Sequence, residues 1–266
     1  MREITMDEIK KLQLDILVQI AAFCKAEKLT WWLDYGTLIG AARHKGYIPW
    51  DDDVDIGMPR EDYDFFIKNF NQSGNQRYIV SSMDSDHHFP WPFAKVFDMN
   101  TTLFEPDING LKQHVFVDLF VYDNAPDNDR VFRKMQKETL FLSSLHSNRV
   151  GNYIPRGNSI RRAFVLFARS LLRLFPEGFF CSKVESLRQR YNGHNTKRIA
   201  CYYSKGEPVL REDMIQTRLA DFEQYRFPIP MRFEEHILGC YGFPYDELPP
   251  EEQRVNKHQF VAYLND

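Results

Sequence analysis

The chain has 266 residues, and 43% of them are hydrophobic, which is enough for a sizeable folded core and excludes disorder of the whole chain. Its 34 basic and 37 acidic residues give a formal net charge of −3, so the composition gives no overall signal for nucleic-acid binding. No apolar run reaches the ~18 residues that a membrane-spanning helix needs. The four cysteines form no C-x-x-C pair and the first residues do not resemble a signal peptide, so we expect free thiols in a cytoplasmic protein.

Helix and strand patterns alternate along the first 150 residues. A capping box at Thr5 and Glu8 begins an amphipathic helix that we predict over residues 6–28. Further helices are expected at 38–43, 59–70 and 130–147, and strands at 31–35, 53–58, 77–83, 93–99 and 115–122. The Asp-, Asn- and Pro-rich residues 123–129 are expected to form a loop. This alternation predicts an α/β fold.

The second half of the chain has a different pattern. Residues 151–158 contain Gly, Pro and Asn and mark the predicted domain boundary. Beyond them, helices are expected at 159–174, 180–192 and 231–241, with short strand-like pieces between the last two. We therefore predict a catalytic core over residues 1–150. A mainly helical C-terminal portion over residues 151–266 would pack on this core and face an acceptor or a membrane.

Four aspartates surround the start of the strand predicted at 53–58. Side chains two apart on a strand share a face, so Asp51, Asp53 and Asp55 are expected to point one way and Asp52 another. Carboxylates are the ligands that Mg²⁺ prefers, and like charges this close are costly without a cation. We interpret the group as a metal site; a solvated acidic turn is the alternative.

Two further features support a metal site that binds phosphate. The glycine of Gly36-Thr37 would let the backbone approach a phosphate at the start of a helix, and the pair followed by the Asp53–Asp55 strand matches the nucleotidyltransferase signature. Asp118 lies inside an apolar run, where an unpaired acid is costly. We predict that Asp118 is the third acid of the site; a structural hydrogen bond is the alternative.

Other side chains are candidates for binding a nucleotide donor. Basic residues could contact its diphosphate; the alternative is that they are solvated surface charges. The candidates are Arg43, Lys45, Lys95, Arg254 and His258. Trp91 and Phe93 could stack on a base or surround a quaternary ammonium, although aromatic residues are more often part of a core. Zinc binding by Cys181, His194 and Cys201 is a weak hypothesis because their spacing fits no known motif.

The stretch 160–175 combines four arginines on about a third of a helix circumference with a large apolar face. The arginines are Arg161, Arg162, Arg169 and Arg173. A basic amphipathic helix of this kind can lie on an anionic membrane. The alternative is a core helix with a solvated arginine stripe.

Residues 35–56, YGTLIGAARHKGYIPWDDDVDI, closely resemble the LicD family of phosphocholine transferases, which includes fukutin and fukutin-related protein. The segments 93–98 and 117–120, and the tail from 241 to 254 with His258, are also similar. The resemblance extends over nearly the whole chain.

This resemblance implies a nucleotidyltransferase-like mixed sheet flanked by helices, with Mg²⁺, or Mn²⁺ in its place, as cofactor. It implies transfer of phosphocholine, or a similar phosphoryl-alcohol, from CDP-choline to a sugar of a glycan such as teichoic acid or lipopolysaccharide, with release of CMP. The acceptor would be a glycan or a lipid-linked glycan, and the protein would work at the inner face of the membrane. Asp53 and Asp55 would be catalytic metal ligands with Asp51 close by, and Asp118 would bind metal or act as base.

Three other functions remain open from the sequence. The same acids would serve a nucleotidyltransferase that moves the nucleoside monophosphate half of the donor, or a D-x-D glycosyltransferase that uses a sugar nucleotide. A non-catalytic module that binds a nucleotide or a membrane is less consistent with the complete set of acids.

Overall fold

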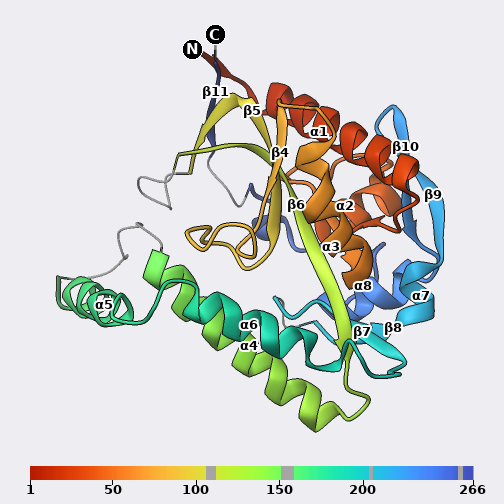
Figure 1. Ribbon diagram of the computed structural model, residues 1–266. Coiled ribbons are helices and arrows are strands. Elements are labelled where there is room, and N and C mark those ends of the chain that lie inside the picture. Colours follow the sequence, from red (N-terminus) through yellow and green to blue (C-terminus); the bar gives the residue numbers. More distant parts are fainter. Residues whose placement is uncertain (106–111, 151–158, 204–205, 257–259, 266) are drawn as a thin grey trace.

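The computed structural model describes residues 1–105, 112–150, 159–203, 206–256 and 260–265. Its centre is a mixed sheet with the strand order β1-β11-β5-β6-β3-β2, in which β4 adds to β5 and β7 pairs with β6 and β8 (Figure 1). These strands are β1 (Arg2–Ile4), β2 (Trp32–Leu33), β3 (Asp55–Pro59), β4 (Tyr78–Ser81), β5 (Ala94–Phe104), β6 (Lys112–Ala125), β7 (Arg198–Ala200), β8 (Val209–Leu210) and β11 (Val261–Leu264). The strands β3 and β6 are parallel, and the other pairs are antiparallel.

Helices flank this sheet. They are α1 (Met6–Glu27), α2 (Tyr35–Ile39), α3 (Arg60–Asn69), α4 (Asp129–Val150), α5 (Ser159–Leu172), α6 (Phe179–Arg188), α7 (Arg211–Ile215) and α8 (Phe233–Tyr241). The α1 and α3 helices pack on the sheet through β5, β6 and β3, while α4 packs on α5 and α6. The predicted mixed α/β architecture is confirmed. None of the helices in the described part of the chain is long and apolar enough to cross a membrane.

The first helix follows directly from the sequence. The Thr5 hydroxyl accepts the Glu8 amide hydrogen and the Glu8 carboxylate accepts the Thr5 amide hydrogen, so the predicted capping box is present. The apolar residues Ile9, Ile16 and Ile20 recur at helical spacing and are buried in the main core. The helix therefore forms one wall of the core beneath the sheet.

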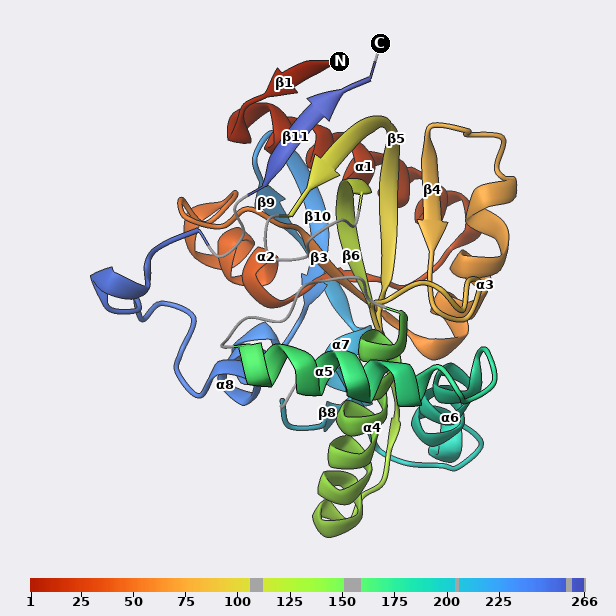
Figure 2. The same cartoon turned by 90° about the vertical axis from the view of Figure 1, so that its left-hand side faces the viewer.

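The C-terminal portion does more than pack on the core. Its strands β7 and β11 extend the central sheet, and β9 (Thr217–Phe222) and β10 (Tyr225–Pro230) form a separate hairpin. The N- and C-terminal strands β1 and β11 lie side by side as an antiparallel pair at one edge (Figure 2). The boundary predicted at residues 151–158 lies outside the described residues.

Residues 123–125 correct the prediction of a loop at 123–129. The strand β6 continues to Ala125 because Asp123 and its neighbours pair with β7, which lies more than 70 residues downstream. Asp123 is fully buried, and its carboxylate accepts two hydrogen bonds from Arg60, at 2.7 and 2.8 Å. This distant pairing and the buried ion pair override the loop propensity of the local sequence.

Candidate active site

Three predicted site residues form a row across three neighbouring strands. Asp55 on β3 is the register partner of Asp118 on β6, and Asp118 is the register partner of Lys95 on β5. The ammonium of Lys95 donates a hydrogen bond of 2.6 Å to Asp118, and both side chains are buried. This ion pair stabilises the charge of Asp118 inside the sheet, so the acid has the partner that its apolar surroundings require.

Lys95 is also surrounded by aromatic rings. Its nitrogen lies 3.3 Å from the ring centre of Phe116, 5.0 Å from that of Trp91 and 5.2 Å from that of Phe93. These distances are within the range of cation–π attraction. Trp91 and Phe93, which the sequence suggested as a cage for a donor cation, therefore face the ammonium of Lys95. This attraction helps to hold Lys95 against Asp118.

The acids form a group suited to a divalent cation. Oxygens of Asp53, Asp55 and Asp118 lie within 4.8 Å of one another. Burial raises the pKa of Asp55 well above its usual range, and the charges of Asp53 and Asp118 raise it further. Oxygen donors alone, at this separation, fit Mg²⁺ or Mn²⁺. A bound ion would relieve the repulsion that raises the pKa of Asp55, so the donor set fits the predicted metal.

Strand alternation predicted that Asp52 points away from the other acids, but its side chain lies near two of them. An Asp52 oxygen lies within 4.8 Å of oxygens of both Asp51 and Asp53, and the Asp52 side chain is buried. The alternation fails because β3 begins only at Asp55, so the preceding acids lie in irregular backbone. Asp51, Asp52 and Asp53 therefore form a second acidic group, which shares Asp53 with the group of Asp53, Asp55 and Asp118.

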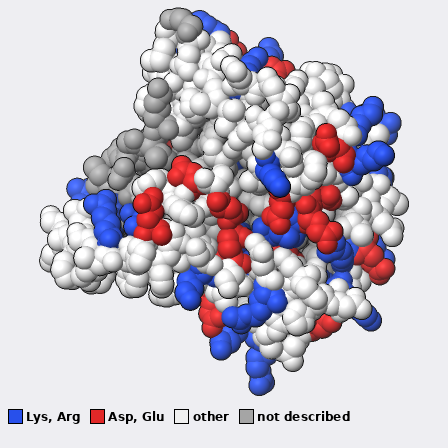
Figure 3. Space-filling model, in the orientation of Figure 1, with Lys and Arg blue, Asp and Glu red and all other residues white. Residues whose placement is uncertain are grey.

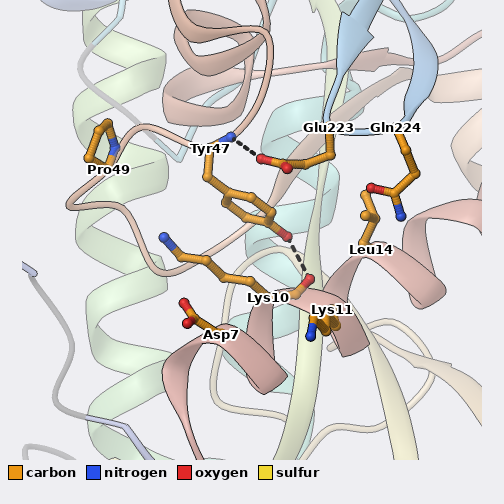
Figure 4. Close-up of a pocket in the computed structure, with 8 residues that line it drawn as sticks. All are labelled: Asp7, Lys10, Lys11, Leu14, Tyr47, Pro49, Glu223 and Gln224. Atoms are coloured by element: carbon orange, nitrogen blue, oxygen red, sulfur yellow. Dashed lines mark hydrogen bonds between the residues drawn. The ribbon is translucent and has the colours of Figure 1, made fainter.

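The acidic loop is tied to α1 and to the β9–β10 hairpin. The amide of Gln13 donates a 2.9 Å hydrogen bond to the Asp52 carbonyl. The Tyr47 hydroxyl donates to the Lys10 carbonyl, and the Tyr47 amide donates to Glu223 in the hairpin (Figure 4). These contacts hold the loop before the acids in place from two sides.

Gly36 and Thr37 position the acids. The hydroxyl oxygen of Thr37 accepts a 2.8 Å hydrogen bond from the Asp55 amide. A Cβ atom on Gly36 would lie 2.5 Å from an oxygen of Asp51, closer than any side chain tolerates. A side chain at position 36 would therefore have to displace the Asp51 carboxylate. The approach of a phosphate to this glycine stays a prediction.

Substituting Gly36 by alanine is expected to lower Mn²⁺ affinity by about tenfold or more, because the added methyl group displaces Asp51. Isothermal titration of the metal-free protein with Mn²⁺ measures this. Gly239→Ala is the control, since a Cβ there meets nothing within 4 Å. Equal affinities for the two variants would exclude a steric role of Gly36 at the metal group.

A buried network that the sequence did not indicate lies directly behind the acids. Asp34, which is fully buried, donates its amide hydrogen to the Asp55 carbonyl at 2.9 Å. Its carboxylate contacts the His236 ring at 2.7 Å and accepts the Tyr122 hydroxyl hydrogen at 2.6 Å. The network joins β2, β6 and α8, so it fixes the backbone at Asp55. His236 is 202 residues from Asp34, and no local pattern could have linked them.

The His236 contact predicts that stability falls at alkaline pH. Burial alone would lower the pKa of His236, but the Asp34 carboxylate outweighs it and raises the pKa to about 10 from the usual 6.5. Because the folded pKa is the higher one, the stabilisation is complete below pH ~6.5 and is lost as the pH rises through about 10. Urea unfolding from pH 6 to above 10 should therefore show a decline on the order of a few kcal/mol.

Two variants separate this contribution from other titrations. His236→Gln should flatten the decline, whereas His88→Gln should not, because the His88 side chain is 73% exposed. The same decline in parent and His236→Gln would contradict a charged His236 in the folded protein.

A cavity of about 410 Å³ opens beside the acids. Its lining includes Gly36, Arg43, Trp50, Asp51 and Tyr241. The Arg43 guanidinium is fixed by hydrogen bonds to the carbonyls of two tail residues, Tyr245 and Glu247.

Arg254 also comes from the tail and lies 5.8 Å from the ring centre of Trp50. Burial lowers the pKa of Arg43, and the charge of Arg254 lowers it further, which places the two cations near each other. The structure therefore places the two predicted arginines near each other: Arg43 lines the cavity, and Arg254 lies between two lining residues, Gln253 and Val255. Lys45 is exposed and does not line it, and His258 lies outside the described residues.

The zinc hypothesis is wrong for the residues described. Among the side chains that the structure describes, the groups close enough to share an ion consist of aspartates. The Cys181 sulfur instead contacts the His146 ring at 3.1 Å, and Cys201 is buried in the cluster around Trp32. All four cysteines are free thiols, as predicted.

Comparisons with known proteins agree with this geometry. Residues 28–147 match the family model described as LicD/FKTN/FKRP, nucleotidyltransferase domain. The chain is 28% identical to the Lipopolysaccharide cholinephosphotransferase LicD of Haemophilus influenzae, over 99% of this chain and 100% of that protein.

Shorter matches fall on eukaryotic proteins. Ribitol 5-phosphate transferase FKRP of Homo sapiens is 46% identical over 43 residues, 16% of this chain and 9% of that protein. Mannosyltransferase regulator 4 of Saccharomyces cerevisiae is 37% identical over 71 residues, 24% of this chain and 6% of that protein. The domain match and the full-length similarity confirm the predicted resemblance: this chain is similar to the LicD family of transferases, and residues 28–147 match its nucleotidyltransferase domain.

Proposed function

We propose that this protein transfers phosphocholine, or a similar phosphoryl-alcohol, from CDP-choline to a sugar of a cell-surface glycan and releases CMP. Lipopolysaccharide is the acceptor we favour, with teichoic acid as the other candidate. One observation carries the proposal: an acidic group lies beside a cavity that Arg43 lines, in a chain that aligns along its length with a protein named a lipopolysaccharide cholinephosphotransferase.

The acidic group would hold Mg²⁺, or Mn²⁺ in its place, through Asp53, Asp55 and Asp118, with Asp51 close by. When bound, such an ion neutralises charge on the donor diphosphate and on the attacking oxygen. The fit rests on the donor set and on the like-charge repulsion at Asp55 described above.

The protein side chains would act as follows. Arg43 and Arg254 bind the diphosphate at the cavity, with the Gly36-Thr37 turn at its base and His258 as a further contact. The acceptor hydroxyl oxygen attacks the phosphorus that bears choline, and the bond from this phosphorus to the oxygen of CMP breaks. The hydroxyl proton goes to Asp118, whose carboxylate is held by the hydrogen bond from the ammonium of Lys95.

A nucleotidyltransferase reaction is the second candidate, and it has a specific observation in its favour. The family model that matches residues 28–147 is described as a nucleotidyltransferase domain. The same acids would then catalyse attack on the phosphorus next to cytidine, and CMP would become attached to the acceptor. A D-x-D glycosyltransferase would require a sugar nucleotide in place of CDP-choline.

The proposal is tested by incubating the protein with Mg²⁺, lipopolysaccharide and CDP-choline, and by measuring the mass of the glycan. The expected result is a glycan whose mass increases by one phosphocholine. When a chelator removes the metal, the mass of the glycan should stay unchanged. Parallel reactions with CDP-ribitol and with teichoic acid establish the alcohol and the acceptor. An unmodified glycan with every CDP-alcohol would contradict the proposal.

A further inference from the structure

The α5 helix exposes a continuous apolar stripe. Its large side chains recur every three or four residues, so they share one face of the helix. Their exposed fractions are 80% for Ile160, 70% for Phe164, 62% for Phe167 and 80% for Leu174, and Leu171 and Phe175 are also exposed. The α5 helix projects from the body of the protein on the side away from β9 and β10 (Figure 1). The interpretation of this stretch as a core helix is therefore wrong.

Such a stripe requires a partner. Single exposed apolar residues are common, but a contiguous exposed patch on a protein surface usually marks an interaction site. Six large side chains, four on α5 and two in the turn that follows it, form such a patch.

The charges of this segment indicate which partner fits. Residues 159–176 contain four arginines and no acidic residue. Arg162 and Arg173 are exposed, whereas Arg169 is buried and does not join an exposed arginine stripe. In Figure 3 the left edge is mainly uncharged surface, with basic side chains above it and acidic side chains next to these.

We propose that α5 and the following turn dock in the plane of an anionic lipid membrane. The apolar stripe enters the interface, while the positive charges of Arg162, on the other side of α5, and of Arg173, in the turn, attract the anionic lipid surface. A second copy of this chain fits less well, because its α5 segment carries the same positive charge and no acidic residue. The helix, at 14 residues, lies on the membrane and does not cross it.

Membrane docking gives the transferase a reason to prefer a lipid-linked glycan, since enzyme and acceptor would then share one surface. That consequence rests on the proposed function. The docking itself does not, because vesicle binding is measured without donor, metal or glycan.

Co-sedimentation with lipid vesicles tests the proposal. The parent protein should bind vesicles of equal parts phosphatidylglycerol and phosphatidylcholine, and should bind pure phosphatidylcholine about tenfold less tightly or weaker. The pair Phe164→Ser with Phe167→Ser should weaken binding by about tenfold or more. The pair Arg162→Gln with Arg173→Gln should also weaken it by about tenfold, as should high salt.

Leu219→Ser is the matched control, because this side chain is 54% exposed on β9 and should leave binding unchanged. Thermal unfolding of each variant confirms that these surface changes do not disturb the fold. Absence of vesicle binding by the parent, or equal binding by the parent and the double phenylalanine variant, would overturn the proposal. A dimer in light scattering that the phenylalanine variant abolishes would assign the stripe to a second copy instead.

Discussion

Replacing Asp55 by asparagine is expected to reduce the transfer rate by at least about 1,000-fold while making the metal-free protein more stable. Asp55 is buried between Asp53 and Asp118, and burial followed by these charges raises its pKa well above the usual range. Asparagine keeps the size of the side chain but removes the charge that repels its neighbours. It also removes the anionic oxygen that a metal ion needs.

Two measurements on the same variant separate these effects. The initial rate of choline transfer should collapse, and the melting temperature in the presence of a chelator should rise. Adding Mg²⁺ should then stabilise the parent but not Asp55→Asn. Asp15→Asn, an exposed acid on α1, is the control and should change neither quantity. A variant that transfers choline at the parental rate would remove Asp55 from the site.

Replacing Lys95 by methionine should lower kcat/KM by about 100-fold or more, equivalent to roughly 3 kcal/mol. The ammonium of Lys95 lies 2.6 Å from Asp118, and both groups are buried. Without this cation, Asp118 loses its buried hydrogen-bond donor and counter-charge, so its carboxylate is no longer held in place to accept the proton of the acceptor hydroxyl. Breaking a buried pair from one side should also reduce the free energy of unfolding by about 3–5 kcal/mol.

A double-mutant cycle distinguishes this account from a role for Lys95 in donor binding alone. Lys95→Met should cost far less stability in an Asp118→Asn background, because no buried acid is then left without its partner. Lys68→Met, at an exposed position of α3, serves as the control. An effect confined to KM for CDP-choline, with kcat and stability unchanged, would assign Lys95 to the donor phosphates instead.

Local patterns identified much of this site because its key residues are close in sequence or have unusual surroundings. The strand beginning at Asp55, the helix after Thr5 and the acid in the apolar run at Asp118 are visible as periodicity, capping and composition. Alternation failed for Asp52, since that rule applies only to extended backbone and the strand begins three residues later.

Pairings between distant segments were not accessible from the sequence. Lys95 and Asp118 were each candidates, but their contact depends on the register of β5 against β6. The contact of Asp34 with His236 depends on α8 returning to the start of α2. The helical period placed Arg169 among the exposed arginines on α5, but only the fold determines which side of a helix faces the body.

The central claim is that the distal phosphorus of the donor is attacked and that CMP leaves. It is tested most directly with CDP-choline labelled differently in the choline and cytidine parts, incubated with the protein, Mg²⁺ and lipopolysaccharide. The account predicts that the choline label enters the glycan in step with the release of cytidine label as free CMP. Cytidine label attached to the glycan, with phosphocholine released, would contradict it and establish a nucleotidyltransferase.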